Sequence, residues 1–177
     1  MFTQVYFQHT RLALDFHIEK TLEYLLGSTG GKFPVPSAQS INEYLQWDDW
    51  KVLGILANGG GGKHGQYIAT RNPYRSIYET PEVPDNSDQI VFEKVLIALG
   101  DLVQFVADAR KAWYSVGDKD LLIVPEGSGQ PKHGKPLSAY SQVVKLLPSV
   151  EQRRIYVRPT DRPSAMSKVA GITGGAM

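Results

Sequence analysis

The sequence contains no cysteine, which excludes disulfide bonds, thiolate zinc sites and cysteine nucleophiles and is typical of a reducing compartment. It also lacks an excess of either charge, because 19 Lys and Arg against 18 Asp and Glu give a formal net charge of +1. Such a chain has no global field to attract nucleic acid or a membrane surface. No apolar run is long enough to span a bilayer, and the first residues lack the basic and apolar regions of a signal peptide. These absences predict a cytoplasmic protein that binds neither membrane nor nucleic acid.

The chain of 177 residues, 42% of them hydrophobic, is long enough for one domain or two small lobes with a real core. Its longest uninterrupted helical pattern covers residues 1–26, with apolar residues near a 3.6-residue period and no Pro or Gly before Gly27. Side chains of several chemical kinds gather in its first half, namely Tyr6, Phe7, Gln8, His9 and Arg11. No capping residue precedes this helix, so we expect a further segment ahead of it.

The remaining pattern predicts an α+β fold, with a mainly helical N-terminal lobe at 1–80 and a small α+β C-terminal lobe at 87–170. In the first lobe, Ser40 and Glu43 have the spacing of a capping box, which predicts a short helix there. Further helices are expected from 48 or 49 to the glycines at 59–62 and over 63–70, followed by an extended segment at 75–80. The Pro-rich residues 81–86 form the expected linker.

In the second lobe, the spacing of apolar residues predicts a helix over 88–99 and a final helix over 162–169. Residues 121–124 read as a buried strand, 141–147 as a short helix and 154–157 as another strand. The segment 102–106 is compatible with either a strand or more helix. The glycine-rich tail at 171–177 is expected to be flexible.

The motifs for common chemistries are incomplete. The run Gly59-Gly-Gly-Gly62-Lys63 is no P-loop, because Ala57 and His64 stand where Gly and Ser or Thr are needed, so we interpret it as a turn between helices. The spacing of eight between His9 and His17 is too wide for a helical metal pair, and no HExxH motif occurs. We therefore expect no metal site made by this chain alone.

A basic cluster lies near the C-terminus, formed by Arg153, Arg154, Arg158, Arg162 and Lys168. Guanidinium forks suit phosphates and carboxylates. The alternative is that the cluster is the solvated face of an edge strand, where positive charge prevents pairing with other chains. The sequence favours the second interpretation.

One segment leads to a resemblance. Gln4-Val-Tyr6-Phe7-Gln8-His9-Thr10-Arg11 resembles the segment that follows the catalytic core in HD-domain phosphohydrolases, which have a Tyr-x-His-Lys pattern there. The similarity extends to bacterial HD-superfamily hydrolases and to the sterile-alpha-motif-and-HD-domain dNTP triphosphohydrolases. Further matches follow in the same order over residues 1–160, at Ile41-Asn-Glu-Tyr44 to Trp50-Lys-Val-Leu53, Asn72-Pro-Tyr74-Arg75-Ser-Ile-Tyr78-Glu-Thr, Ala109-Arg110-Lys-Ala-Trp113-Tyr114, and Leu146-Leu-Pro148 to Arg154-Ile-Tyr156-Val.

The resemblance implies helices that trail from an HD core, followed by an α+β C-terminal lobe. The family's divalent metal ion is held by a His, a His-Asp pair and a distant Asp, all upstream of the matched region. None of these ligands can be placed in this sequence, so no cofactor is expected in this chain. The resemblance therefore implies the non-catalytic C-terminal part of a metal-dependent phosphohydrolase of the dGTPase type.

The resemblance also implies nucleotide-binding residues. Tyr6 matches a tyrosine beside the deoxyribose, Gln8 and His9 fall at the family's His-Lys pair, and Arg75 matches an arginine that contacts a regulatory nucleotide. The family has a basic residue four positions after that arginine, where this chain has Glu79, whose carboxylate would repel a triphosphate. The alternative for Tyr6 and His9 is helix packing against another domain.

Three functions follow as hypotheses. The first is a C-terminal part with an oligomerisation, regulatory or nucleotide-pocket-completing role, whose partners are an upstream HD core or a separate HD chain, a second copy of this chain and a dNTP. The second is an autonomous metal-dependent dNTP triphosphohydrolase. The third is a protein-interaction module that uses an uncovered apolar face.

Overall fold

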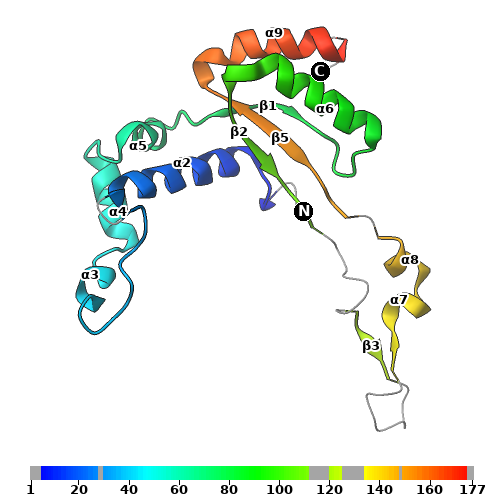
Figure 1. Cartoon of the computed structure of the whole chain (residues 1–177), viewed down its shortest axis with the longest axis horizontal. Coiled ribbons are helices and arrows are strands. Elements are labelled where there is room, and N and C mark those ends of the chain that lie inside the picture. The colour runs from blue at the N-terminus through cyan, green and yellow to red at the C-terminus, as the bar shows by residue number, and fades with distance from the viewer. Residues whose placement is uncertain (1–4, 28–29, 112–119, 125–133, 148, 175–177) are drawn as a thin grey trace.

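A computed structural model of the protein describes residues 5–27, 30–111, 120–124, 134–147 and 149–174. It has the expected α+β fold: a mainly helical N-terminal lobe is followed by a lobe in which helices cover a small antiparallel sheet (Figure 1). Within the described residues, no helix combines the length and the apolar character needed to cross a bilayer. Of the expected flexible tail at 171–177, residues 171–173 belong instead to the final helix, and residues 175–177 lie outside the described residues.

The α-helices are α2 (His9–Leu25), α3 (Ile41–Leu45), α4 (Asp49–Ala57), α5 (Gly62–Ala69), α6 (Asn86–Leu99), α7 (Leu137–Tyr140), α8 (Gln142–Lys145) and α9 (Arg162–Thr173). Short 3-10 turns are η2 (Gly100–Leu102) and η4 (Pro159–Asp161). The strands are β1 (Arg75–Glu79), β2 (Val103–Asp108), β3 (Leu122–Ile123), β4 (Lys135–Pro136) and β5 (Arg153–Val157). The segment 102–106, for which the sequence left strand and helix open, forms strand β2 from Val103 onward. Helix α3 follows Ser40 as expected, but the Ser40 side chain makes no cap hydrogen bond, so the expected capping box is wrong.

The first long helix begins later than its apolar pattern predicts. Residues 6 and 7 form a turn, and Gln8 has the extended backbone of an N-cap. The Gln8 side chain accepts a hydrogen bond from the Arg11 backbone N–H at 2.7 Å. The expectation of one continuous helix over 1–26 is therefore wrong within the described residues, because the chain turns at residues 6–7 and α2 begins only after its cap, Gln8.

In the helical lobe, α5 packs closely against α2 and α4. The glycine run joins α4 to α5 as a tight turn, as expected. Gly61 has φ +84° and lies against Thr21 and Leu56, so a side chain there would be both strained and crowded. At Gly65 a Cβ would lie 2.4 Å from the Gly60 carbonyl oxygen. Glycine is thus required where the two helices meet.

The main sheet has the order β1-β5-β2, and both pairings are antiparallel. Arg75 in β1 pairs with Val157, and Asp108 in β2 pairs with Arg153. Strand β5 is therefore the central strand of the sheet, and the expectation that it is an edge strand is wrong. Strand β1 precedes residues 81–86 in the chain but lies in the sheet of the C-terminal lobe.

The two faces of the sheet bury different side chains. Ile155 and Val157 of β5 face α6 and α9, which lie together on one side of the sheet, and pack with Phe92 and Val169 (Figure 1). The opposite face of the sheet lies toward α2. There Tyr156 of β5 is buried in one cluster with Ala13 of α2 and with Tyr74, the residue that precedes β1. The alternation along β5 is the period of two that a strand imposes. The central strand consequently holds both lobes together.

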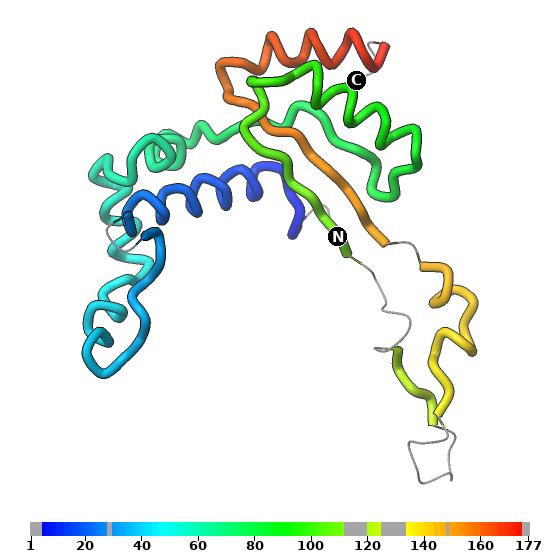
Figure 2. Tube along the Cα trace, viewed as in Figure 1, coloured from blue at the N-terminus to red at the C-terminus, as the bar shows by residue number. Residues whose placement is uncertain are grey.

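The strand pair β3–β4 and helices α7 and α8 form an arm that extends away from the main sheet (Figure 2). Leu122 and Ile123 are 57% and 40% exposed. The expected buried strand at 121–124 is therefore present only as a short, exposed strand. Its apolar residues are not covered by other described parts of the chain.

Candidate anion-binding site

The structure brings two of the four candidate site residues together. His9 and Arg75 line one open, polar depression of about 410 Å³. Its described lining residues are His9, Thr10, Tyr74, Arg75, Ser76 and Arg162. Gln8 lies just outside it as the cap of α2. Tyr6 is 58% exposed, and its ring lies 6.0 Å from the Arg11 guanidinium and 5.8 Å from Lys111 Nζ.

Each basic residue of the depression is positioned by the start of an element. His9 is the first residue of α2, and its carbonyl oxygen accepts a hydrogen bond of 3.0 Å from the Tyr156 hydroxyl. Arg75 is the first residue of β1 and donates from Nη2 to Asn72 Oδ1 at 3.3 Å. Arg162 is the first residue of α9. Three segments far apart in the sequence therefore present their side chains at one place.

The depression has a one-sided charge. No carboxylate is among its described lining residues, and among the described residues the Arg162 guanidinium has no hydrogen-bond or ion-pair partner. Burial raises the pKa of the Tyr74 hydroxyl, and the guanidinium of Arg158 partly opposes this shift. Guanidinium groups with free N–H donors bind phosphate or carboxylate oxygens in a bidentate way. The arrangement is suited to binding an anion with several oxygen atoms.

Most of the basic cluster predicted near the C-terminus is engaged in structural contacts. Arg153 donates to Glu93 and Asp108, while Arg158 donates to Gln104 and Lys168 to the Ala98 carbonyl oxygen. The buried Arg154 binds Glu79, the Gln152 side chain and the Phe7 carbonyl oxygen. Only Arg162 of the cluster lines the depression.

A histidine pair that the sequence did not reveal lies beside the site. His17 of α2 and His64 of α5 meet with Nδ1 atoms 2.9 Å apart. The Tyr74 backbone N–H donates to His17 Nε2 at 3.1 Å. Because Nε2 accepts, neutral His17 carries its proton on Nδ1 and donates it to His64. The pair joins the helical lobe to the segment that leads into β1.

The surroundings of this pair keep it neutral. His17 is fully buried among aromatic rings, including Tyr74 at 4.3 Å and Tyr67 at 4.8 Å between ring centroids. Burial, and to a smaller extent His64, lowers the pKa of His17 from 6.5 to about 4. The pKa of His64 is lowered too, mainly by burial and then by Lys63 and Lys20. Spacing rules within one helix cannot detect a pair formed between two helices.

The histidine pair does not have the chemistry of a metal site. A metal ion on His17 Nδ1 would require the ring proton on Nε2, where the Tyr74 N–H already donates. Across the described residues, no three His, Cys, Asp or Glu side chains gather in a metal-binding arrangement. The donor groups therefore do not fit the divalent metal ion that the HD resemblance implies for the full-length family.

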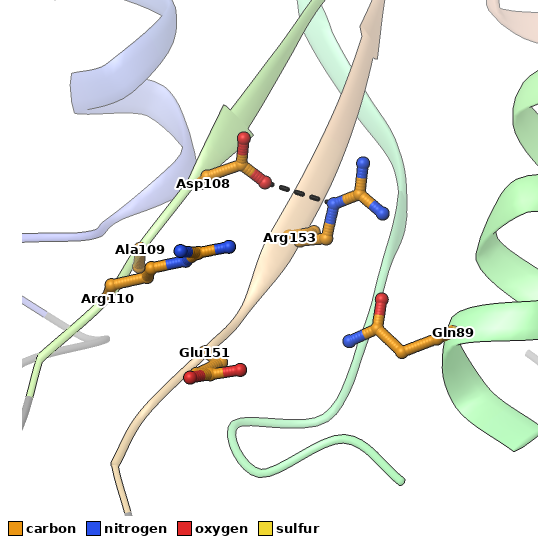
Figure 3. Close-up of a pocket in the computed structure, with 6 residues that line it drawn as sticks. All are labelled: Gln89, Asp108, Ala109, Arg110, Glu151 and Arg153. Carbon is orange, nitrogen blue, oxygen red and sulfur yellow. Dashed lines mark hydrogen bonds and ion pairs between the residues drawn. The ribbon is translucent and has the colours of Figure 1, made fainter. Parts of the chain in front are cut away.

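A second polar depression, of about 470 Å³, lies at the other end of β2 and β5 (Figure 3). Its described lining residues are Gln89, Asp108, Ala109, Arg110, Glu151 and Arg153. The carboxylates of Asp108 and Glu151 balance the charges of Arg110 and Arg153, and Arg153 already donates to Asp108 at 3.0 Å. This depression lacks the unbalanced positive charge of the first and is the weaker candidate for an anion.

The fold and the site thus define an α+β protein with a basic depression where two lobes meet. No family model matches the sequence, and no curated protein matches it. Among solved structures, the chain is similar to the crystal structure of a hypothetical protein from Aquifex aeolicus, with a TM-score of 0.68 and 19% sequence identity over 96% of this chain. The chain spans 42% of the length of that protein. At this level of identity, the likeness shows a shared fold alone.

Proposed function

We propose that this chain is the C-terminal, non-catalytic part of an HD-superfamily (deoxy)nucleoside triphosphate phosphohydrolase, and that its basic depression binds the phosphates of a nucleotide. The observation that carries the proposal is the convergence of His9, Arg75 and Arg162 on one depression without a lining carboxylate. The HD resemblance implies nucleotide-binding roles for His9 and Arg75, and these two residues line the same depression. Arg162 adds a second guanidinium to the same place.

The position of Glu79 supports this proposal. The resemblance suggested that its carboxylate would repel a triphosphate at Arg75. Glu79 instead forms an ion pair with the buried guanidinium of Arg154 and is not among the lining residues of the depression. Its negative charge is therefore largely compensated before any ligand arrives.

In this proposal the metal ion and the hydrolytic chemistry belong to an HD catalytic core, located upstream or on a separate chain. This chain contributes nucleotide binding and regulation, and it forms oligomers with the catalytic part or with a second copy of itself. We place this chain and the HD catalytic core in the cytoplasm, and the lack of cysteine in this chain fits a reducing compartment.

The experiment is a hydrolysis assay with the four dNTPs and Mg²⁺ or Mn²⁺, run with the purified chain alone and together with an HD-motif protein encoded next to it. Activity of the mixture that exceeds that of the HD protein alone, and that falls in Arg75→Gln, supports the proposal. Lys145→Gln is the control with the same change of charge, because Lys145 is an exposed cation on α8, outside both polar depressions. Hydrolysis by this chain alone would favour an autonomous dNTP triphosphohydrolase, and an inert mixture would refute the proposed partnership.

An apolar hollow of about 410 Å³ in the helical lobe favours a second candidate, a protein-interaction module. Its apolar lining residues are Ile18, Leu22, Phe33, Trp47, Val52, Leu53, Leu56 and Ile68. Leu53 is 55% exposed, so much of this surface faces solvent. Self-association that is lost in Leu53→Glu, with dNTP binding unchanged, would identify this hollow as an interface.

A further inference from the structure

We infer that the basic depression recognises the oligophosphate group of its ligand in its metal-free form and does not read a base or a sugar. The inference rests on the proposed function, because it concerns the ligand of the same site. It goes further by defining the ligand class as oligophosphates in general, whether nucleotide-linked or inorganic.

The lining residues cannot distinguish one base from another. Bases are discriminated mainly by bidentate contacts from guanidinium, amide or carboxylate groups that match a donor and acceptor pattern. The described lining contains no Asn, Gln, Asp or Glu. Its hydroxyl groups, on Thr10, Ser76 and the buried Tyr74, either donate or accept and therefore suit any base edge. The guanidinium groups of Arg75 and Arg162 are the bidentate groups of the described lining, and while they bind phosphate oxygens they are not available to read a base edge.

Aromatic stacking cannot supply selectivity either. The ring of Tyr74 is 4% exposed and is covered by Phe16, His17 and Tyr67. His9 is the exposed ring among the described lining residues. Stacking on a single ring tolerates every base, because every base has a π face. A nucleoside would gain little here without its phosphates.

The charge of the lining also selects the form of the phosphate. Mg²⁺ is held in proteins by carboxylates together with phosphate oxygens, and the described lining offers no carboxylate. A bound Mg²⁺ would instead add positive charge beside Arg75 and Arg162 and would neutralise part of the anion they attract. The metal-free oligophosphate is therefore the preferred ligand.

The test is isothermal titration calorimetry of the full chain at pH 7.5. The ligands are sodium tripolyphosphate, the four dNTPs, GTP and deoxyguanosine, each measured in EDTA and in excess Mg²⁺. We expect tripolyphosphate and all the nucleotides to bind within about threefold of one another, no binding of deoxyguanosine, and weaker binding in Mg²⁺. Arg162→Gln should weaken tripolyphosphate binding about tenfold or more, since a hydrogen bond to a charged group is lost, and Lys145→Gln, an equal loss of charge on α8 outside both polar depressions, should leave it unchanged.

Three results would overturn the inference: a preference of tenfold or more for one base or sugar, tighter binding in Mg²⁺, or tripolyphosphate binding that Arg162→Gln does not weaken. These outcomes are separate from failure of the proposed function. Selective dNTP binding would retain a nucleotide site and reject the ligand class. Unselective oligophosphate binding with no effect on any HD partner would retain the ligand class and reject the partnership. If no oligophosphate binds, the depression is not a ligand site and both are rejected.

Discussion

The buried histidine pair predicts how the stability of the fold depends on pH. His17 has a pKa of about 4 in the folded protein and an ordinary value of 6.5. Between these values the unfolded chain binds a proton that the folded chain excludes. The contribution of neutral His17 is therefore fully present above pH 6.5 and is lost as pH falls toward 4. The change that isolates it is His17→Gln, because an amide can accept from Tyr74 and donate to His64 without titrating.

The interval between 6.5 and about 4 corresponds to about 3 kcal/mol, at 1.36 kcal/mol per pH unit. His17 has no solvent-exposed surface, so screening by solvent acts on this value only weakly. The wild-type protein should lose about 3 kcal/mol more of its free energy of unfolding than His17→Gln does between pH 7 and pH 4. The lowered pKa of His64 acts in the same direction in both proteins.

The assay is urea unfolding followed by circular dichroism at four pH values from 7 to 4, with the free energy of unfolding obtained by linear extrapolation. Thr21→Val is the matched control, because Thr21 is equally buried on the same helix one turn later and does not titrate. It should keep the wild-type pH dependence. If the curves of wild type and His17→Gln run parallel, the assignment of the acid sensitivity to His17 is wrong.

Four further predictions concern stability. Thr21→Val should also leave the free energy of unfolding unchanged or raise it by up to about 1 kcal/mol, because Thr21 Oγ1 is buried without a hydrogen-bond partner among the described residues, and chemical denaturation measures this. Arg154→Met should cost about 2–4 kcal/mol in urea unfolding, since it leaves the Phe7 carbonyl and Gln152 unpaired, and an unchanged midpoint would contradict that role. Tyr156→Phe should cost about 1 kcal/mol through loss of the hydrogen bond to the His9 carbonyl, and a costless change would mean that water replaces it. Arg71→Gly should raise the thermal midpoint, with a gain of about 0.5 kcal/mol, because Arg71 has φ +53°, and Arg71→Ala should give no such gain.

Local signals predicted much of the fold correctly. Periodicity and the following Gly100 placed the helix that is α6, and Pro159 marked the end of β5. Local signals gave wrong predictions where contacts between distant parts of the chain decide the local structure. The apolar pattern continues through Tyr6 and Phe7, but the chain turns there because the Phe7 carbonyl is bound by Arg154, far away in the sequence. The many arginines near β5 suggested an edge strand, but β5 is the central strand. Its Arg154 is buried because Glu79 and Gln152, which lie outside β5, bind its guanidinium.

The candidate site was only partly predictable for the same reason. The HD resemblance identified His9 and Arg75 as candidate residues but did not indicate that they lie close together. Arg162 was assigned to a basic cluster that was interpreted as a solvated surface. The histidine pair joins positions 47 residues apart, and no spacing rule applies between two separate helices. The pair can be predicted only when α2 and α5 are known to pack together.

The central strand explains why the basic residues converge. Strand β5 pairs with β1, so that Val157 fixes Arg75 at one end of the sheet, and the chain continues from β5 through η4 directly into Arg162. On the other face, the Tyr156 hydroxyl holds the first residue of α2 by its carbonyl oxygen. One strand of five residues thereby sets the positions of His9, Arg75 and Arg162. A change on β5 that spares all three side chains, such as Tyr156→Phe, should therefore weaken oligophosphate binding as well as stability, whereas a core change remote from the depression, such as Val95→Ala on α6, should reduce stability alone.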